Sequence, residues 1–305
     1  MSLLSVSADS TAGGRDASAR RAPRGMRAQR RLADTLIYAL LVGVGISMAF
    51  PLFWMVSTAL RTEPELYILP PPLLPLTWTL DNIPQAITRV PYWTMLSNTL
   101  SVAVVVTFGR VITSTFAGFA FARLHFPGRD RIFLRYLGVL MIPFPVTMVP
   151  LYLLMNQLGL VDNLASIILP PFVSAYNTFL CRQFMLSLPG ELEDAARIDG
   201  CNPPRIYWHV ILPLCGPVVA ATTIFSFLTT WNSFIWPLII LSSPDNLTLP
   251  IGLTMIATAR VNYGGYTPWT LLMAAATAAA IPMLIVYLVA QRYFVEGIAL
   301  TGIKG

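Results

Sequence analysis

Charged residues are scarce in this chain. They make up 11% of the sequence and hydrophobic residues make up 55%, against about 25% and about 45–50% in ordinary soluble domains. Lysine occurs only at Lys304, next to the C-terminus, so the chain cannot build a Gly-rich phosphate-binding loop with its lysine. The composition therefore predicts a protein solvated by lipid and excludes nucleotide hydrolysis by such a loop. We expect a non-enzymatic chain.

Cysteine and histidine are also scarce. Cys181, Cys201 and Cys215 are odd in number and indicate no disulfide framework. His125 and His209 have no partners at metal-ligand spacing, and both flank predicted helix ends. We therefore expect no metal, no catalytic group and no bound cofactor in this chain.

Long hydrophobic runs are abundant. About 20 mostly apolar residues form a helix that crosses a hydrocarbon core of about 30 Å. The fold class predicted is an all-α integral membrane protein with six transmembrane helices. The six stretches are Thr35 to Thr58, Met95 to Ala122, Ile132 to Met155, Leu164 to Met185, Leu214 to Leu238 and Thr270 to Val289. Pro143, Pro145 and Pro150 predict a kink in the third.

Basic residues predict the orientation. Seven of them lie between Arg15 and Arg31, in a Ser/Ala/Gly/Arg-rich stretch. Residues 1–34 are therefore predicted to be a disordered cytoplasmic tail, and residues 35–305 the membrane domain. With the N-terminus inside, sixteen basic residues lie on the cytoplasmic side and three outside, as membrane proteins prefer. Both termini are predicted to be cytoplasmic. The positive charge then belongs to the membrane surface and gives no support to a nucleic-acid partner.

The connection between the fourth and fifth spans, about 186–213, is the most informative segment. Acidic residues at Glu191, Glu193 and Asp194 suit the first turn of a helix, and Gly200 suits its end. Asn202 is predicted to cap a second helix. Leu192, Ala195, Ala196 and Asp199 share a face by helical spacing, and the alanines make that face low. Such a helix suits the groove of a soluble partner.

The same segment resembles the signature loop of binding-protein-dependent ABC importer permeases. The resemblance lies in Asp194-Ala195-Ala196, Gly200, Val210 and Leu212-Pro213, with Asp in place of Glu and Val in place of Ile. The MalG-like carbohydrate subgroup is indicated by three further pieces. These are Phe119 to Gly128, Trp231-Asn232 and the ending Gln291-Arg292 with Gly302 to Gly305.

The resemblance implies a type I ABC importer permease fold in a bacterial cytoplasmic membrane. It implies that a coupling helix, with Glu193, Asp194 and Asp199, sits in a cleft of an ATPase subunit, and that Gly302, Lys304 and Gly305 contact the ATPase. The implied partners are a second, MalF-like permease, two ATPase subunits that use ATP and Mg, and an extracytoplasmic binding protein. The implied cargo is a sugar, of the maltose or trehalose type among others.

Polar residues inside the spans have two interpretations. Tyr176, Asn177, Trp231 and Asn232 are candidates for a substrate cavity, but asparagine also bonds across helices. Arg110 either marks a pathway or is satisfied by backbone carbonyls.

Two other functions remain open. One is a permease of the same class for another solute, such as a glycerol-phosphate diester, a polyol or a peptide. The other is an ion-driven secondary transporter. No acidic residue occurs in the six predicted spans, and this disfavours a proton relay.

Overall fold

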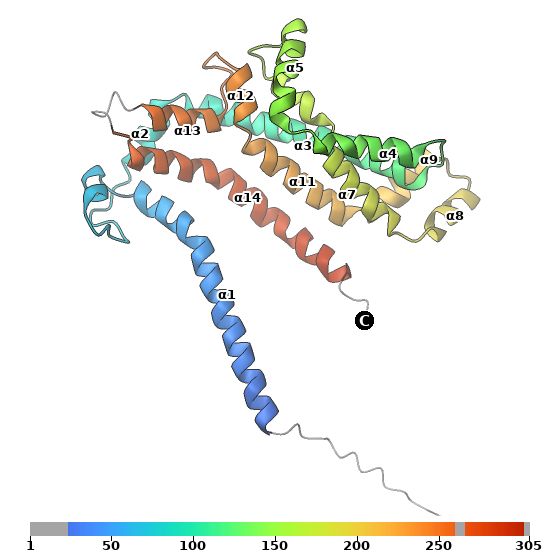
Figure 1. Cartoon of the computed structure of the whole chain (residues 1–305), viewed down its shortest axis with the longest axis horizontal. Coiled ribbons are helices and arrows are strands. Elements are labelled where there is room, and N and C mark those ends of the chain that lie inside the picture. Colours follow the sequence, from blue (N-terminus) through green and yellow to red (C-terminus); the bar gives the residue numbers. More distant parts are fainter. Residues whose placement is uncertain (1–23, 260–265, 302–305) are drawn as a thin grey trace, which may run out of the picture. The chain divides into compact units, whose positions relative to one another are not determined.

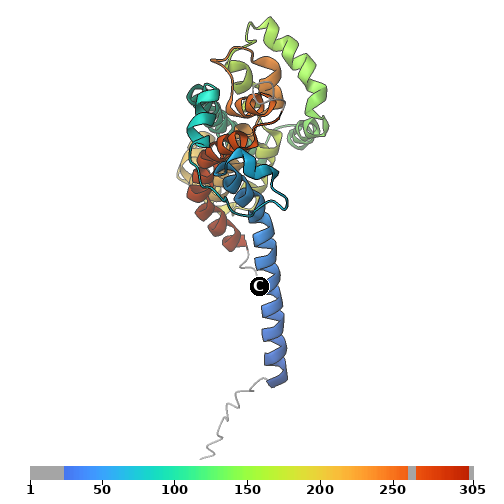
Figure 2. The ribbon, with the colours of Figure 1, turned by 90° about the vertical axis from the view of Figure 1, so that its left-hand side faces the viewer.

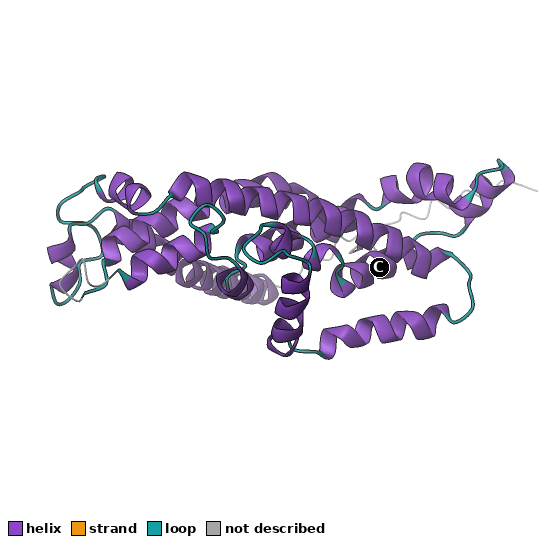
Figure 3. Cartoon of the chain, turned by 90° about the horizontal axis from the view of Figure 1, so that it is seen from above, coloured by secondary structure: helices purple, strands orange, loops and turns teal. Residues whose placement is uncertain are grey.

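The computed structural model describes residues 24–259 and 266–301, with side chains for 34–259 and 266–289. Within those ranges every regular element is helical (Figure 3). The expected all-α fold is therefore confirmed. The chain divides into two units, Met1–Phe53 and Trp54–Gly305.

The first unit contains most of helix α1 (Arg24–Ala59). Figure 2 shows α1 as one continuous helix, and its residues 34–59 are long and apolar enough to cross a membrane. The helix begins at Arg24 rather than near Thr35, so it extends into the segment predicted to be a disordered tail. Residues 1–23 of that tail lie outside the described part of the chain.

Helix α3 (Tyr92–Arg123) organises the second unit (Figure 1). It packs against α7 (Ala175–Leu186) and α11 (Gly216–Trp231), and α14 (Trp269–Thr301) packs against α11 and α2 (Asn82–Arg89). The contact between α3 and α7 is close, since a Cβ added at Gly118 would lie 2.6 Å from the Cβ of Cys181. A side chain at position 118 would therefore push the two helices apart.

Two helix pairs are sharply bent. The first joins α4 (Arg129–Gly138) and η2 (Val139–Met141) to α5 (Phe144–Gln157) at 98°. Pro143 lies at the bend, so the predicted proline kink is confirmed. The second joins α9 (Pro203–Ile206), η4 (Tyr207–Ile211) and α10 (Leu212–Leu214) to α11 at 80°. In the described residues three helices can cross a membrane singly, or up to five if each bent pair forms one span.

The fourth predicted span is not one helix. Residues 164–185 divide into α6 (Ala165–Ile168), η3 (Pro170–Phe172) and α7. Pro170 has no N–H to donate to the carbonyl of Ser166, and the indole N–H of Trp236 donates to that oxygen instead, at 3.0 Å. Ser174 then starts α7 by accepting the N–H of Asn177.

The fifth predicted span is shorter than expected. Helix α11 ends at Trp231, and after a turn the chain enters α12 (Ile235–Ile240). Helix α13 (Leu249–Thr258) follows, outside any predicted span.

The segment between α1 and α2, which contains η1 (Glu63–Tyr67), is ordered by buried polar groups. The carboxylate of Glu65 accepts the backbone N–H groups of Leu76 and Thr77 at 2.8 and 3.0 Å. The Asn82 amide donates to the carbonyls of Ala59 and Arg61. These bonds satisfy backbone groups that have no partner within a helix or sheet, and they order the connection.

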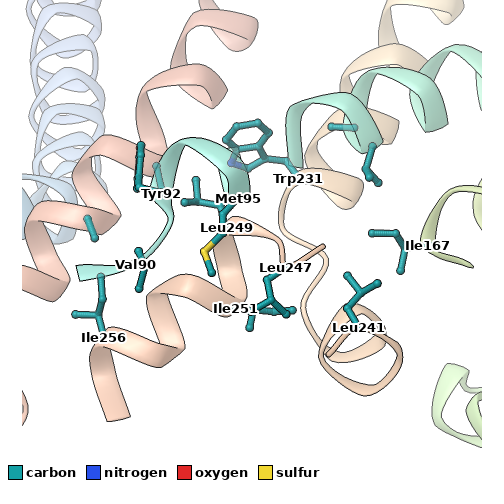
Figure 4. Packing of buried hydrophobic residues seen from close by; sticks show 14 of the residues in the cluster. Val90, Tyr92, Met95, Ile167, Trp231, Leu241, Leu247, Leu249, Ile251 and Ile256 are labelled. Carbon is teal, nitrogen blue, oxygen red and sulfur yellow. The ribbon is translucent and has the colours of Figure 1, made fainter. Parts of the chain in front are cut away.

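Two apolar clusters hold the second unit together. In the larger one, Met95, Leu249 and Trp231 converge from α3, α13 and α11 (Figure 4). The smaller one joins the end of α3 to α7, α8 (Glu191–Ile198) and η4 through Phe119, Met185, Ala196 and Tyr207. The smaller cluster anchors the connection at about 186–213, which the sequence analysis identified as the most informative segment.

Candidate functional site

Helix α8 forms as its local sequence predicts. Glu191, Glu193 and Asp194 occupy the first turn, where carboxylates complement the helix dipole. Gly200 has φ +78° and directly follows the C-cap residue Asp199. The Asn202 side chain accepts the N–H of Arg205 at 3.1 Å and caps α9. The predicted sequence of helix, glycine turn and capped helix is confirmed.

The faces of α8 differ from the prediction. Ala195 and Asp199 are exposed, as are Leu192 at 40% and Ile198 at 87%. Ala196 is 8% exposed and belongs to the smaller apolar cluster. The prediction that Ala195 and Ala196 lie on one outward face is therefore wrong. Successive residues are about 100° apart around a helix, and the packing of α8 against α9 and η4, within the smaller apolar cluster, turns Ala196 inward.

Glu193 anchors the inward face of α8. Its Oε1 lies 3.0 Å from Nε of Arg123 at the end of α3, and both side chains are mostly buried. Arg123 also donates to the carbonyl oxygen of Leu188 at 2.7 Å and to that of Met185. In the sequence, Arg123 belongs to the family-like piece Phe119 to Gly128, and no role could be predicted for it. The structure makes it the link between α8 and a membrane helix.

Two of the remaining signature residues help to anchor the 186–213 loop. Val210 and Leu212 are partly buried against the smaller cluster, and Pro213 is exposed. In the same segment the hydroxyl of Tyr207 lies 2.9 Å from that of Thr115 on α3. The 186–213 loop is thus attached to the helices of the second unit at several points, while one face of α8 is exposed.

A cavity of about 1040 Å³ lies farther along α3. Arg110, Tyr176, Asn177 and Asn232 are among its lining residues, so the structure brings together three of the four residues predicted for a cavity. The size suits a small ligand. The aromatic pair of Tyr176 and Phe225, with centroids 6.2 Å apart, offers an apolar surface on the same wall.

Trp231 does not line this cavity. Its side chain is 4% exposed, stacks on Phe227 with centroids 5.5 Å apart, and belongs to the larger apolar cluster. Asn177 both lines the cavity and bonds across helices, because its amide donates to the hydroxyl of Ser226 on α11 at 2.7 Å.

Arg110 also combines its two interpretations. Its Nε donates to the carbonyl of Pro171 at 2.8 Å, and NH1 donates to the Thr229 hydroxyl at 3.0 Å. It is therefore held by η3 and α11 while lining the cavity.

Two further expectations concern sites elsewhere. The described residues contain no group of three or more His, Cys, Asp or Glu side chains that could hold a metal ion. Gly302, Lys304 and Gly305 lie outside the described residues.

Comparison with known proteins defines the class. Residues 114–299 match the family described as "Binding-protein-dependent transport system inner membrane component", and the chain belongs to that family. It is a multi-pass membrane permease, and the resemblance seen in the signature loop is confirmed.

Individual relatives are transport proteins. The chain is 38% identical to the arabinooligosaccharides transport system permease protein AraQ of Halalkalibacterium halodurans, over 91% of this chain and 100% of that protein. It is 35% identical to the sn-glycerol-3-phosphate transport system permease protein UgpE of Escherichia coli, over 85% and 93%. These relatives support a transport role rather than an enzymatic one.

The fold agrees with this class. A bacterial ABC transporter involved in the import of the acidic polysaccharide alginate contains a chain that superposes with a TM-score of 0.77. The match covers 87% of this chain and 98% of that one, at 23% identity. The fold is that of an ABC importer permease.

Proposed function

We propose that this chain is one transmembrane half of an ATP-driven importer of carbohydrates or solutes derived from them. It pairs with a MalF-like permease, two ATPase subunits that bind ATP and Mg, and an extracytoplasmic binding protein. It lies in a bacterial cytoplasmic membrane with both termini in the cytoplasm. The transport systems named for its relatives, for arabinooligosaccharides and sn-glycerol 3-phosphate, support this class of cargo.

The open face of α8 carries the proposal. Ile198 is 87% exposed and Leu192 40% exposed, on a short helix whose opposite face is buried. Exposed apolar side chains beside small ones suit insertion into a groove. We assign that groove to the ATPase, with Asp194, Ala195, Asp199 and Gly200 at the contact. Gly302, Lys304 and Gly305 add a second contact in this proposal.

Helix α3 supplies the mechanical link. Arg123 at its end holds α8 through Glu193, and Arg110 and Thr99 on the same helix line the cavity. Arg123 lies thirteen positions after Arg110 in the same helix, a rise of about 20 Å at 1.5 Å per residue. When ATP closes the ATPase pair, movement of α8 is transmitted along α3 to the cavity, which then opens to the other side.

Gly200 provides the test. Its φ of +78° strains any β-branched residue, whereas Gly190 has φ −69°, and nothing lies within 4 Å of a Cβ added at either position. Gly200→Val should therefore misdirect α8, at a cost of about 1–2 kcal/mol, and Gly190→Val should not.

The experiment compares these variants in proteoliposomes that contain the complete importer. Uptake of labelled arabinotriose and glycerol 3-phosphate is measured with ATP hydrolysis. We expect Gly200→Val to reduce uptake and solute-stimulated hydrolysis together, while Gly190→Val stays near wild type. Equal activity of both variants would reject α8 as the coupling element. Uptake by this chain alone under a proton gradient would favour the secondary transporter.

A further inference from the structure

The cavity has a single charged residue. Among its lining residues in the described part of the chain, Arg110 carries a charge and all others are neutral. The polar neighbours are hydroxyls and amides such as Ser174, Tyr176, Asn177 and Asn232. A ligand in this space therefore meets one positive charge and no negative one.

The guanidinium of Arg110 is oriented by neutral groups. Nε donates to the carbonyl of Pro171 at 2.8 Å and NH1 to the hydroxyl of Thr229 at 3.0 Å. Arginine has five N–H donors in a rigid planar fork, and these two bonds use only part of it. The remaining donors are held on the cavity wall with little loss of side-chain freedom on binding.

No carboxylate of the described residues balances this charge. The ion pairs found there join Asp130, Glu193 and Asp194 to other arginines. No Asp or Glu occurs within the six predicted spans. An unbalanced cation at membrane depth is unfavourable unless a counter-charge approaches it. An anionic ligand brings that counter-charge, whereas a neutral sugar leaves the cation as it was.

The backbone around Arg110 agrees with this preference. Pro171, which accepts from Arg110, lies shortly before the start of α7 at Ala175. The N-terminal end of a helix carries partial positive charge, and Ser174 and Tyr176 at this end line the cavity. This feature supplements the argument from the side chain and does not replace it.

We infer that the cavity binds carbohydrates or polyols that bear an oxyanion, with the free N–H groups of Arg110 donating to the carboxylate or phosphate. The inference rests on the proposed transport function and narrows its cargo. Arg110 is then a specificity-determining residue, and Tyr176 and Asn232 face the uncharged part of the solute. Carboxylate and phosphate share this chemistry, and the experiment separates them.

The experiment measures equilibrium binding to the complex of both permeases and the two ATPase subunits in nanodiscs, with the binding protein left out. Two probe pairs differ in charge: trigalacturonate against its methyl ester, and glycerol 3-phosphate against glycerol. Wild type is compared with Arg110→Gln, which removes the charge, and Arg110→Lys, which keeps the charge but loses the fork. Arg135→Gln is the matched control, because Arg135 is exposed on α4 and does not line the cavity.

We expect one acid to bind at least about tenfold more tightly than its neutral partner, as a charge-assisted bidentate contact gives. The preferred pair identifies carboxylate or phosphate. Arg110→Gln should remove that preference while changing neutral binding less than about twofold, Arg110→Lys should keep part of it, and Arg135→Gln all of it.

Three outcomes would overturn the inference. The first is that neither acid exceeds its neutral partner, as an acidic residue of the second permease paired with Arg110 would cause. The second is that Arg110→Gln lowers acid and neutral binding equally, which makes Arg110 a structural residue. The third is that Arg135→Gln abolishes the preference as well. If any of these three outcomes is found, ATP-driven import of a neutral probe by the wild-type importer would still support the proposed function.

Discussion

Nε of Arg123 lies 3.0 Å from Oε1 of Glu193, and this ion pair ties the last turn of α3 to the first turn of α8. The side chains are 12% and 7% exposed. The pair is therefore shielded from water, and each charge depends on the other. It lies on the face of α8 opposite the one that we assign to the ATPase.

Removing one charge of this pair should loosen α8. Glu193→Gln keeps the shape but leaves the Arg123 cation buried, at a cost of roughly 3 kcal/mol. We expect faster proteolysis of the 186–213 loop and fewer solute molecules imported per ATP hydrolysed. Glu191→Gln, at an exposed site in the same turn, serves as the control and should match wild type. Unchanged proteolysis in Glu193→Gln would show that the pair does not hold α8.

The two adjacent alanines should respond differently to bulk. Ala195 is exposed and Ala196 is 8% exposed within the smaller apolar cluster. Ala195→Trp should leave expression and the melting temperature of the chain intact, but reduce co-purification of the ATPase. Ala196→Trp should overpack the cluster, cost about 1–3 kcal/mol and lower the melting temperature. The opposite assignment of the two effects would reject the orientation of α8.

Asp162 links two loops that are far apart in sequence. Its carboxylate accepts the N–H groups of Ser242 and Ser243, each at 2.9 Å, and the Ser243 hydroxyl. These bonds lower the pKa of Asp162, with the Ser243 hydroxyl contributing most. A lowered folded-state pKa gives stability that is present above the ordinary carboxyl pKa of about 4 and is lost as the pH falls through the folded value.

We expect Asp162→Asn to lower the melting temperature in detergent at pH 7. The difference from wild type should persist down to about pH 5 and shrink below about pH 4. Asparagine tolerates the positive φ of this residue, 55°, so the substitution tests the charge and not the backbone. Asp245→Asn, at an exposed neighbouring position, is the control. A difference that stays constant with pH would exclude the carboxylate as the cause.

Accessibility to an impermeant thiol reagent tests the orientation. In a Cys201→Ser background, whose remaining cysteines Cys181 and Cys215 are buried, single cysteines replace the exposed residues Gln85, Asp245, Arg131 and Asp199. The distribution of basic residues predicts labelling of intact cells at 85 and 245, and at 131 and 199 only after permeabilisation. The reverse pattern would invert the proposed topology.

The fold class and the local geometry of the signature segment could be predicted from the amino-acid sequence. Apolar runs require helices in lipid. The turn at Gly200 and the cap at Asn202 depend on backbone and side-chain chemistry within a few residues. The kink predicted from the prolines of the third span is also present in the structure. Such features follow from short-range interactions, which a sequence displays directly.

The surroundings of individual side chains could not be predicted, because they depend on contacts between distant segments of the chain. The break in the fourth predicted span at Pro170 is stable, because the carbonyl oxygen of Ser166, which the proline cannot bond, accepts the indole N–H of Trp236 from a distant segment. Trp231 packs into the core and Asn232 faces the cavity, although they are adjacent. Ala196 turns inward because α8 packs against α9 and η4 within the smaller cluster, and the ion pair of Arg123 and Glu193 joins α8 to the end of α3. Hydrophobicity and helical period are the same for either orientation of such a short helix, and the contacts that choose between them join residues far apart in the chain.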